Sequence, residues 1–176
     1  MDGHSQQTEF GGKVNTKVQW TLCRTEAHPY NMELGQERRA AGRPLVSVVD
    51  DDESVRESLP DLLGEFGFAA RPFSSAEEFL ASDCVDQTRC LILDIAMPGM
   101  SGPELQRELK IRRREIPIIF ITAQQEDPVR PQVLEQGAIQ CLFKPFSDTA
   151  LLEAVNSAFH TRSVIADGRN SVRSPE

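Results

Sequence analysis

Five side chains that could together hold a phosphoryl group and a metal ion follow short apolar segments of the sequence. They are the carboxylates of Asp50, Asp51 and Asp94, the hydroxyl group of Thr122 and the ammonium group of Lys144. Three carboxylates at one place repel one another and raise one another's pKa unless a cation joins them. Mg²⁺ suits such a cluster, because it is bound by one or two carboxylates, water and phosphate oxygens.

This set of groups is typical of phosphoryl transfer, in which positioning and charge neutralisation provide most of the catalysis. Asp94 would attack as a carboxylate nucleophile and become an aspartyl phosphate. Lys144 would offset the negative charge, and the Thr122 hydroxyl could donate to the phosphoryl oxygens. Each residue alone also has an ordinary structural explanation, such as a helix N-terminal charge. We favour that explanation for Asp52 and Glu53, which begin a predicted helix.

The elements that must position these residues are five buried strands. Short, largely apolar segments of strand length predict them at residues 45–49, 68–73, 90–93, 116–121 and 140–143, and the first of these is β-branched. Five helices alternate with the strands, the last of them following the fifth strand. Ser75 with Glu78 and Ser101 with Glu104 form predicted capping boxes, and Ser147 caps the last helix. Gly67 and Gly137 end the first and fourth helices.

Three prolines bear on the helices. Pro60 lies inside the first helix and should kink it or cost it about 3 kcal/mol. Pro128 and Pro131 confine the start of the fourth helix, expected over roughly residues 129–136.

Strands that alternate with helices predict an α/β fold with a doubly wound parallel sheet. Ligands of such sheets lie beyond the carboxyl ends of the strands, and the candidate residues all follow strand ends. The domain is expected over residues 44–160. Residues 1–43 are polar and are expected to be a flexible extension, and residues 161–176 a disordered tail.

Composition excludes several classes of function. The chain has 176 residues and a net charge of -8, which argues against direct binding of nucleic acid. Its densest basic cluster, Arg112 to Arg114, is interpreted as a solvated helix end. The four cysteines (Cys23, Cys84, Cys90 and Cys141) have no zinc-site spacing and are interpreted as reduced thiols. With neither a signal peptide nor a membrane-spanning run, we expect a soluble, cytoplasmic protein that does not bind membranes.

At this point the sequence resembles the response-regulator receiver family, and within it the FixJ-like subgroup. The motifs that carry the resemblance are Val48-Val49-Asp50-Asp51, Leu93-Asp94 through Gly102, Ile119-Phe120-Ile121-Thr122-Ala123 and Lys144-Pro145-Phe146. Together they are highly specific and span nearly all of residues 44–160. The resemblance implies a flavodoxin-like (CheY-like) sheet of order 2-1-3-4-5 with five helices.

Carried over residue by residue, the resemblance makes Asp94 the phosphoacceptor. Asp50 and Asp51 become metal ligands together with the backbone carbonyl of Ala96, and the metal is Mg²⁺. Thr122 becomes the switch hydroxyl and Lys144 the lysine of such sites, with a cis bond before Pro145. The implied partner is a sensor histidine kinase or a histidine phosphotransfer protein. Signalling would follow by conformational change and docking to an unknown protein, and a homodimer could form on phosphorylation.

Two features depart from the family pattern. Cys141 stands three residues before the lysine, where the family usually has an aromatic ring that moves inward with the threonine. Pro131 lies in the fourth helix, which forms one face of the domain with the fifth strand, and it adds to this departure. Only about 16 residues follow the last predicted helix, too few for the helix-turn-helix domain usual in the subgroup. We therefore expect a receiver without an output domain.

Two other functions remain open. A pseudo-receiver, or a truncated transcription regulator, would act as a phosphorylation-independent interaction module, and Cys141 and Pro131 motivate that hypothesis. An enzyme on a similar sheet is the weakest alternative. A dehalogenase-type phosphatase needs an acidic residue at position 96, which is alanine, and the sequence has no nucleotide-binding glycine loop. Beyond its own phosphorylation and slow dephosphorylation, no catalysis is expected.

Overall fold

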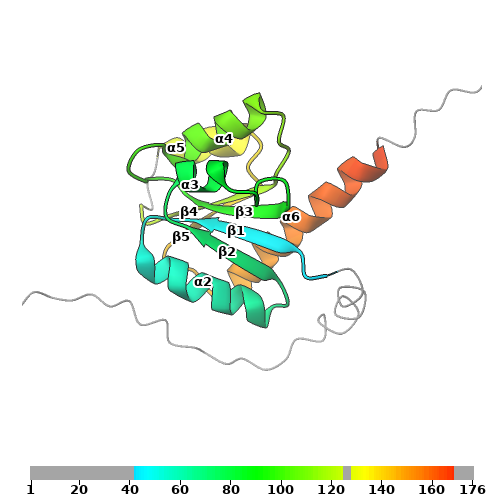
Figure 1. Cartoon of the computed structure of the whole chain (residues 1–176), viewed down its shortest axis with the longest axis horizontal. Helices are drawn as coiled ribbons and strands as arrows, with labels where there is room; N and C mark the ends of the chain where they lie inside the picture. The colour runs from blue at the N-terminus through cyan, green and yellow to red at the C-terminus, as the bar shows by residue number, and fades with distance from the viewer. Residues whose placement is uncertain (1–41, 125–127, 169–176) are drawn as a thin grey trace, which may run out of the picture.

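Five parallel strands form one sheet in the order β2-β1-β3-β4-β5 (Figure 1). The computed structural model describes residues 42–124 and 128–168, and only the backbone of residues 162–168. The strands are β1 (Leu45–Val49), β2 (Ala69–Phe73), β3 (Thr88–Asp94), β4 (Ile118–Thr122) and β5 (Gln140–Phe143). The predicted fold class and strand order are confirmed.

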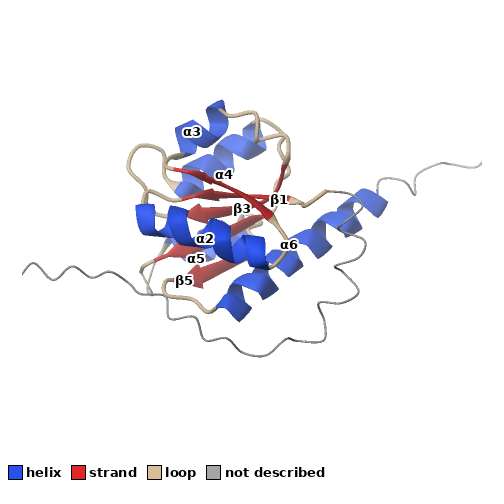
Figure 2. Cartoon of the chain, turned by 60° about the horizontal axis from the view of Figure 1, so that its bottom comes forward, coloured by secondary structure: helices blue, strands red, loops and turns tan. Residues whose placement is uncertain are grey.

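The helices cover the two faces of the sheet in separate layers. Helices α2 (Glu53–Glu65) and α6 (Asp148–Gly168) lie on one face, and α3 (Ala76–Ala81), α4 (Gly102–Ile111) and α5 (Val129–Glu135) lie on the other (Figures 1 and 2). No helix in this part of the chain is long and apolar enough to cross a membrane.

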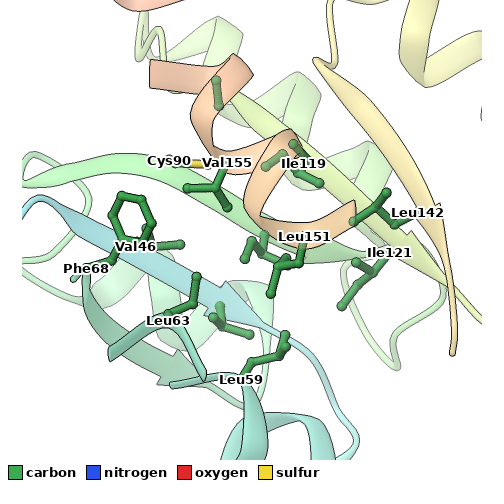
Figure 3. Packing of buried hydrophobic residues seen from close by; sticks show 14 of the residues in the cluster. Val46, Leu59, Leu63, Phe68, Cys90, Ile119, Ile121, Leu142, Leu151 and Val155 are labelled. Atoms are coloured by element: carbon green, nitrogen blue, oxygen red, sulfur yellow. The ribbon is translucent and has the colours of Figure 1, made fainter. Parts of the chain in front are cut away.

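Each layer has its own hydrophobic cluster, because successive side chains of a strand point to opposite faces. In the α2/α6 layer, Leu59 and Leu63 of α2 and Leu151 and Val155 of α6 pack on the sheet (Figure 3). The strand side chains beneath them include Val46, Ile119 and Ile121. In the α3/α4/α5 layer, the helices contribute Phe79, Leu105, Leu109 and Val133, which pack on Leu91, Leu93 and Phe120. The alternation along β3 and β4 therefore divides the core in two.

Helix starts follow the predicted caps with one difference. The Asp52 carboxylate accepts from the Ser54 N–H at 2.9 Å, so Asp52 is the N-cap of α2. Glu104 completes its capping box by accepting from the Ser101 N–H at 2.8 Å. At α3 the predicted box is only half correct. The Ser75 hydroxyl does accept from the Glu78 N–H, but the Glu78 carboxylate binds the N–H of Ser74 instead of Ser75.

Helix ends use residues with positive φ. Gly67 after α2 and Gly137 after α5 have φ of 86° and 91°, as expected for glycine at this position. Helix α4 ends in the same way, with Arg114 N–H donating to the Leu109 carbonyl at 2.8 Å. The residue in the left-handed conformation there is Arg113, with φ of 56°, and it is the only non-glycine residue with positive φ in the described part of the chain.

The prolines and the end of the last helix bear on the sequence expectations. Helix α2 is continuous across Pro60. Helix α5 begins at Val129 and includes Pro131 in its first turn, where the missing N–H would have no partner in the helix. Helix α6 continues to Gly168, so the expectation that the tail begins at residue 161 was wrong for residues 161–168. No glycine or proline interrupts the helix before Gly168.

The cysteines of the described chain are buried and free. Cys84, Cys90 and Cys141 form no disulfide, and Cys23 lies outside the described residues. Burial raises the pKa of the Cys90 thiol to about 12. These thiols therefore pack as small apolar groups, in accordance with the sequence interpretation.

Candidate functional site

The sheet brings four of the predicted site residues to its carboxyl edge. Asp50 follows β1, Asp94 ends β3, Thr122 ends β4 and Lys144 follows β5. These four strands are neighbours in the sheet. Residues that are up to 94 positions apart in the sequence thus lie together because parallel strands all end at the same edge.

Lys144 joins the two buried carboxylates at the centre of this edge. Its Nζ donates to Asp50 Oδ2 at 2.6 Å and to Asp94 Oδ1 at 2.7 Å. Asp50 is fully buried and Asp94 is 5% exposed. The peptide bond between Lys144 and Pro145 is cis, as the sequence predicted. One cation therefore serves two carboxylates that are shielded from water.

The electrostatic balance of this cluster favours protonation of the carboxyl groups. Burial raises the pKa of Asp50 and of Asp94 above their ordinary values, although hydrogen bonds and charge from Lys144 act in the opposite direction. The negative charge of Asp51 also raises the pKa of Asp94. Burial alone would lower the pKa of Lys144, but its bonds to the two carboxylates outweigh that effect and raise it. Burial is the largest of these effects, so the two buried carboxyl groups hold a proton more tightly than an exposed aspartic acid does.

The remaining oxygen of Asp94 faces the loop that follows β3. Asp94 Oδ2 accepts from the Ala96 N–H at 2.7 Å, and Ala96 itself is exposed. The Asp51 side chain is exposed beside the buried pair. Behind Asp94, a Cβ at Gly102 would lie 2.2 Å from the Asp94 backbone carbonyl oxygen. Only glycine allows the first turn of α4 to approach β3 so closely.

Thr122 lies on the β4 side of the cluster and is 2% exposed. Its hydroxyl oxygen accepts from the Gln124 N–H at 3.2 Å, and its carbonyl oxygen accepts from the Lys144 N–H at 2.8 Å. The backbone of Thr122 therefore connects the strand end to the residue that holds both carboxylates.

Two residues near the site were not identified in the sequence. Arg56 of α2 donates through Nη1 to the Asp50 carbonyl at 2.9 Å. Glu77 of α3 accepts from the Met100 N–H at 2.9 Å and thereby holds the loop between β3 and α4. Backbone hydrogen bonds, from its own N–H and from Met100, lower the pKa of Glu77. Both residues look like ordinary charges on an exposed helix face, so their spacing gave no signal.

The position of Cys141 changes what surrounds β5. Cys141 is buried in the α3/α4/α5 layer. The aromatic ring nearest to Lys144 in the sequence is Phe143, and the Arg130 guanidinium of α5 lies 5.0 Å from the centre of that ring. In this chain, α5 and β5 are therefore connected at the surface by a cation–π contact.

The donor set was also assessed as a metal site. Across residues 42–124 and 128–168, no group of three or more His, Cys, Asp or Glu side chains is arranged to enclose a metal ion. Mg²⁺ does not need such a cage, because it usually retains water and takes one or two carboxylates. The surplus negative charge at Asp50, Asp51 and Asp94 is compatible with a divalent cation.

Comparisons with known proteins agree with this geometry. Residues 46–156 match the family described as the response regulator receiver domain. Nodulation protein W of Bradyrhizobium diazoefficiens is 42% identical over 124 residues, which are 70% of this chain and 55% of that protein. The transcriptional regulatory protein FixJ of Rhizobium meliloti is 41% identical over 113 residues, or 64% of this chain and 55% of FixJ. The chain thus spans little more than half the length of these relatives.

Solved structures give the same result. The response regulator StyR shares 42% identity at a TM-score of 0.67, covering 74% of this chain and 66% of StyR. The structure of FixJ-N shares 39% identity at a TM-score of 0.62, covering 68% of this chain and 95% of that one. Receiver domains are in general the non-enzymatic signalling modules of two-component systems. The shared sheet, the placement of its acidic and basic residues and these matches show that the chain belongs to the response regulator receiver family.

Proposed function

We propose that this receiver accepts a phosphoryl group on Asp94 from the phosphohistidine of a sensor histidine kinase or a phosphotransfer protein. An Asp94 carboxylate oxygen forms the new O–P bond while the P–N bond of the phosphohistidine breaks. The electron pair of that bond returns to the imidazole nitrogen. The observation that carries the proposal is the position of Lys144 Nζ, within hydrogen-bond distance of both Asp50 and Asp94. It places one cation where charge develops on the phosphoryl oxygens.

The same proposal gives the metal site to Asp50, Asp51 and the carbonyl of Ala96. Receiver domains generally use Mg²⁺ in phosphorylation. When bound, the ion would neutralise charge on the carboxylates and on the incoming phosphoryl oxygens. Three carboxylates lie at this site and Lys144 bonds only the two buried ones, which supports the assignment because a divalent cation would complete the charge balance.

Signalling would follow from the new charge at Asp94. Phosphorylation adds roughly -1.5 to -2 charges at neutral pH, which shifts the population between two arrangements of the surface. The Thr122 hydroxyl would turn toward a phosphoryl oxygen, for which it must release the Gln124 N–H that it now accepts from. Gln124 would move with it and change the surface available to a docking protein.

A phosphorylation-independent interaction module is the second candidate. One observation favours it: the buried side chain at position 141 is a cysteine, and the neighbouring ring of Phe143 already contacts Arg130. If the switch lacks its moving ring, docking to partners could be independent of Asp94. The test below separates the two candidates.

The test is incubation of the full chain with acetyl phosphate and Mg²⁺, followed by intact-mass measurement. We expect a phosphoryl adduct on the wild type, none on Asp94→Asn, and loss of the wild-type adduct when a chelator removes the metal. A control variant, Asp61→Asn, changes an exposed carboxylate on α2 and should retain the adduct. A folded wild type without an adduct would instead support the phosphorylation-independent module.

Glu77 provides a further prediction about the loop that carries Ala96. Glu77→Ala removes the acceptor of the Met100 N–H, so the loop loses a contact with α3 and phosphorylation by acetyl phosphate should slow roughly fivefold. Glu77→Gln keeps an acceptor oxygen and should largely retain the rate. Glu78→Ala, which changes a neighbour that contacts Ser74 rather than the loop, is the control. Equal rates in all three variants would exclude a positioning role for Glu77.

A further inference from the structure

A cavity of about 1050 Å³ lies at the edge of the sheet opposite the Asp94 site. Thr88 and Ile118, the first residues of β3 and β4, line it, so it lies at the amino-terminal ends of these strands. Val85, Ile116 and Ile139, which are partly exposed, give it an apolar surface, and Lys110, Arg113 and Arg114 are also among its lining residues. Its size is in the range of cavities that bind small organic molecules.

The three basic side chains of the cavity differ in their contacts. Arg114 forms an ion pair with Asp86, and Lys110 donates to the backbone carbonyl of Gln136. The Arg113 side chain, by contrast, makes no hydrogen bond or ion pair with any other residue that the structure describes. Asp86 and Glu115 also line the cavity, and the charge of Asp86 is offset by Arg114. Arg113 is therefore the cation available to a bound anion.

The backbone of Arg113 gives independent support for a role of its side chain. Its φ of 56° is the left-handed conformation that the ends of α2 and α5 fill with Gly67 and Gly137. Glycine is preferred there because a Cβ makes this conformation unfavourable. An arginine at this position is thus held at a conformational cost, and such residues concentrate at functional sites.

Two side-chain oxygens at the cavity have no hydrogen-bond partner among the described residues. They are Gln106 Oε1 and Gln136 Oε1, both shielded from solvent. Gln106 is only 2% exposed, and its Nε2 donates at 3.4 Å to the Val133 carbonyl. A buried acceptor without a partner is unfavourable. Because both oxygens are shielded from solvent, they are a local cost between α4 and α5 and not contacts for a ligand in the cavity.

From these features we propose that the cavity binds a small organic anion. Its charged group would be held by Arg113, and its apolar body would lie along Val85, Ile116 and Ile139. The site uses no residue of the phosphorylation cluster, so it stands independently of the function proposed above.

The test uses 8-anilinonaphthalene-1-sulfonate, an aromatic anion with an N–H donor, in a fluorescence titration of the full chain. N-phenyl-1-naphthylamine, which lacks the sulfonate, is the uncharged comparison. We expect saturable binding of the anionic probe at one site. Arg113→Gln should weaken it about tenfold and leave the affinity for the uncharged probe unchanged. The matched control is Arg112→Gln, because Arg112 pairs with Glu108 and does not line the cavity.

The variant Arg113→Gly distinguishes a role of Arg113 in binding from a role in stability. It should weaken the anionic probe as strongly as Arg113→Gln but raise the melting temperature, since glycine suits the positive φ. Non-saturable binding, equal weakening by Arg112→Gln and Arg113→Gln, or parallel loss of the uncharged probe would overturn the proposal. A lower melting temperature for Arg113→Gly would show that Arg113 is present for stability instead.

Discussion

Replacing Lys144 with methionine is expected to lower the free energy of unfolding at pH 7 by about 3 kcal/mol. Methionine keeps much of the volume of the side chain but removes the only cation within hydrogen-bond distance of both Asp50 and Asp94 in the described chain. Two buried carboxylates would then repel each other without compensation. Urea unfolding of the two proteins would measure the difference, with Arg71→Met, which removes an exposed cation on β2, as the control.

The loss should depend on pH in a defined direction. Asp50 and Asp94 already have pKa values above their ordinary 3.8 in the folded state, so folding makes them bind protons more tightly. Their contribution to stability is therefore greatest below 3.8 and is lost as the pH rises through the folded values. Without Lys144 these values rise further, and the difference between variant and wild type should shrink from pH 7 to pH 5. The same loss at both pH values would contradict this explanation.

Gly102→Ala is expected to have the second large effect. The new Cβ would lie 2.2 Å from the Asp94 carbonyl oxygen and 3.0 Å from the Phe120 ring, so either α4 or the end of β3 must move. We expect a loss of about 3 kcal/mol, at the upper end for overpacked cores. Because Asp94 moves with its backbone, phosphorylation by acetyl phosphate should slow in the fraction that remains folded. Thermal unfolding and the mass assay would measure the two effects.

Gly64→Ala provides a control of opposite sign. Gly64 lies within α2, and a Cβ there would meet no atom within 4 Å. Alanine favours a helix interior over glycine by roughly 0.5–1 kcal/mol, so this variant should be more stable than the wild type. If both alanine variants were destabilised alike, steric contact with Asp94 would not be the cause at Gly102.

Strands β1, β3 and β4 were predictable because each contains a short apolar run of strand length that is followed by a polar residue. The caps at Asp52 and Ser101 followed from side-chain chemistry that acts within one turn. The end of α6 was not predictable in this way, since residues 161–168 make no apolar pattern and only the absence of glycine and proline allows the helix to continue. The sequence could not show that the Glu78 carboxylate binds the N–H of Ser74 and not that of Ser75. The choice depends on local backbone geometry, and two adjacent serines look alike in the sequence.

The positions of the site residues were predictable for a topological reason. Each of Asp50, Asp94, Thr122 and Lys144 follows a strand, and a parallel sheet places all such residues at one edge. The role of Glu77 in holding Met100 was not predictable, because it joins a helix to a loop 23 residues away. Likewise, nothing in the sequence shows that Gln106 is buried or that its amide oxygen lacks a partner among the described residues.

The division of the core into two layers affects which amino-acid substitutions this chain can accept. Cys141 and Phe120 belong to the cluster under α3, α4 and α5, while Leu142 and Ile121, their neighbours in sequence, belong to the cluster under α2 and α6. A substitution in one cluster therefore alters packing on one face only. The surface formed by α5 and β5 can acquire a new docking specificity while the opposite face keeps its contacts. Because the two clusters are separate, a cysteine at position 141 needs no compensating changes beneath α6.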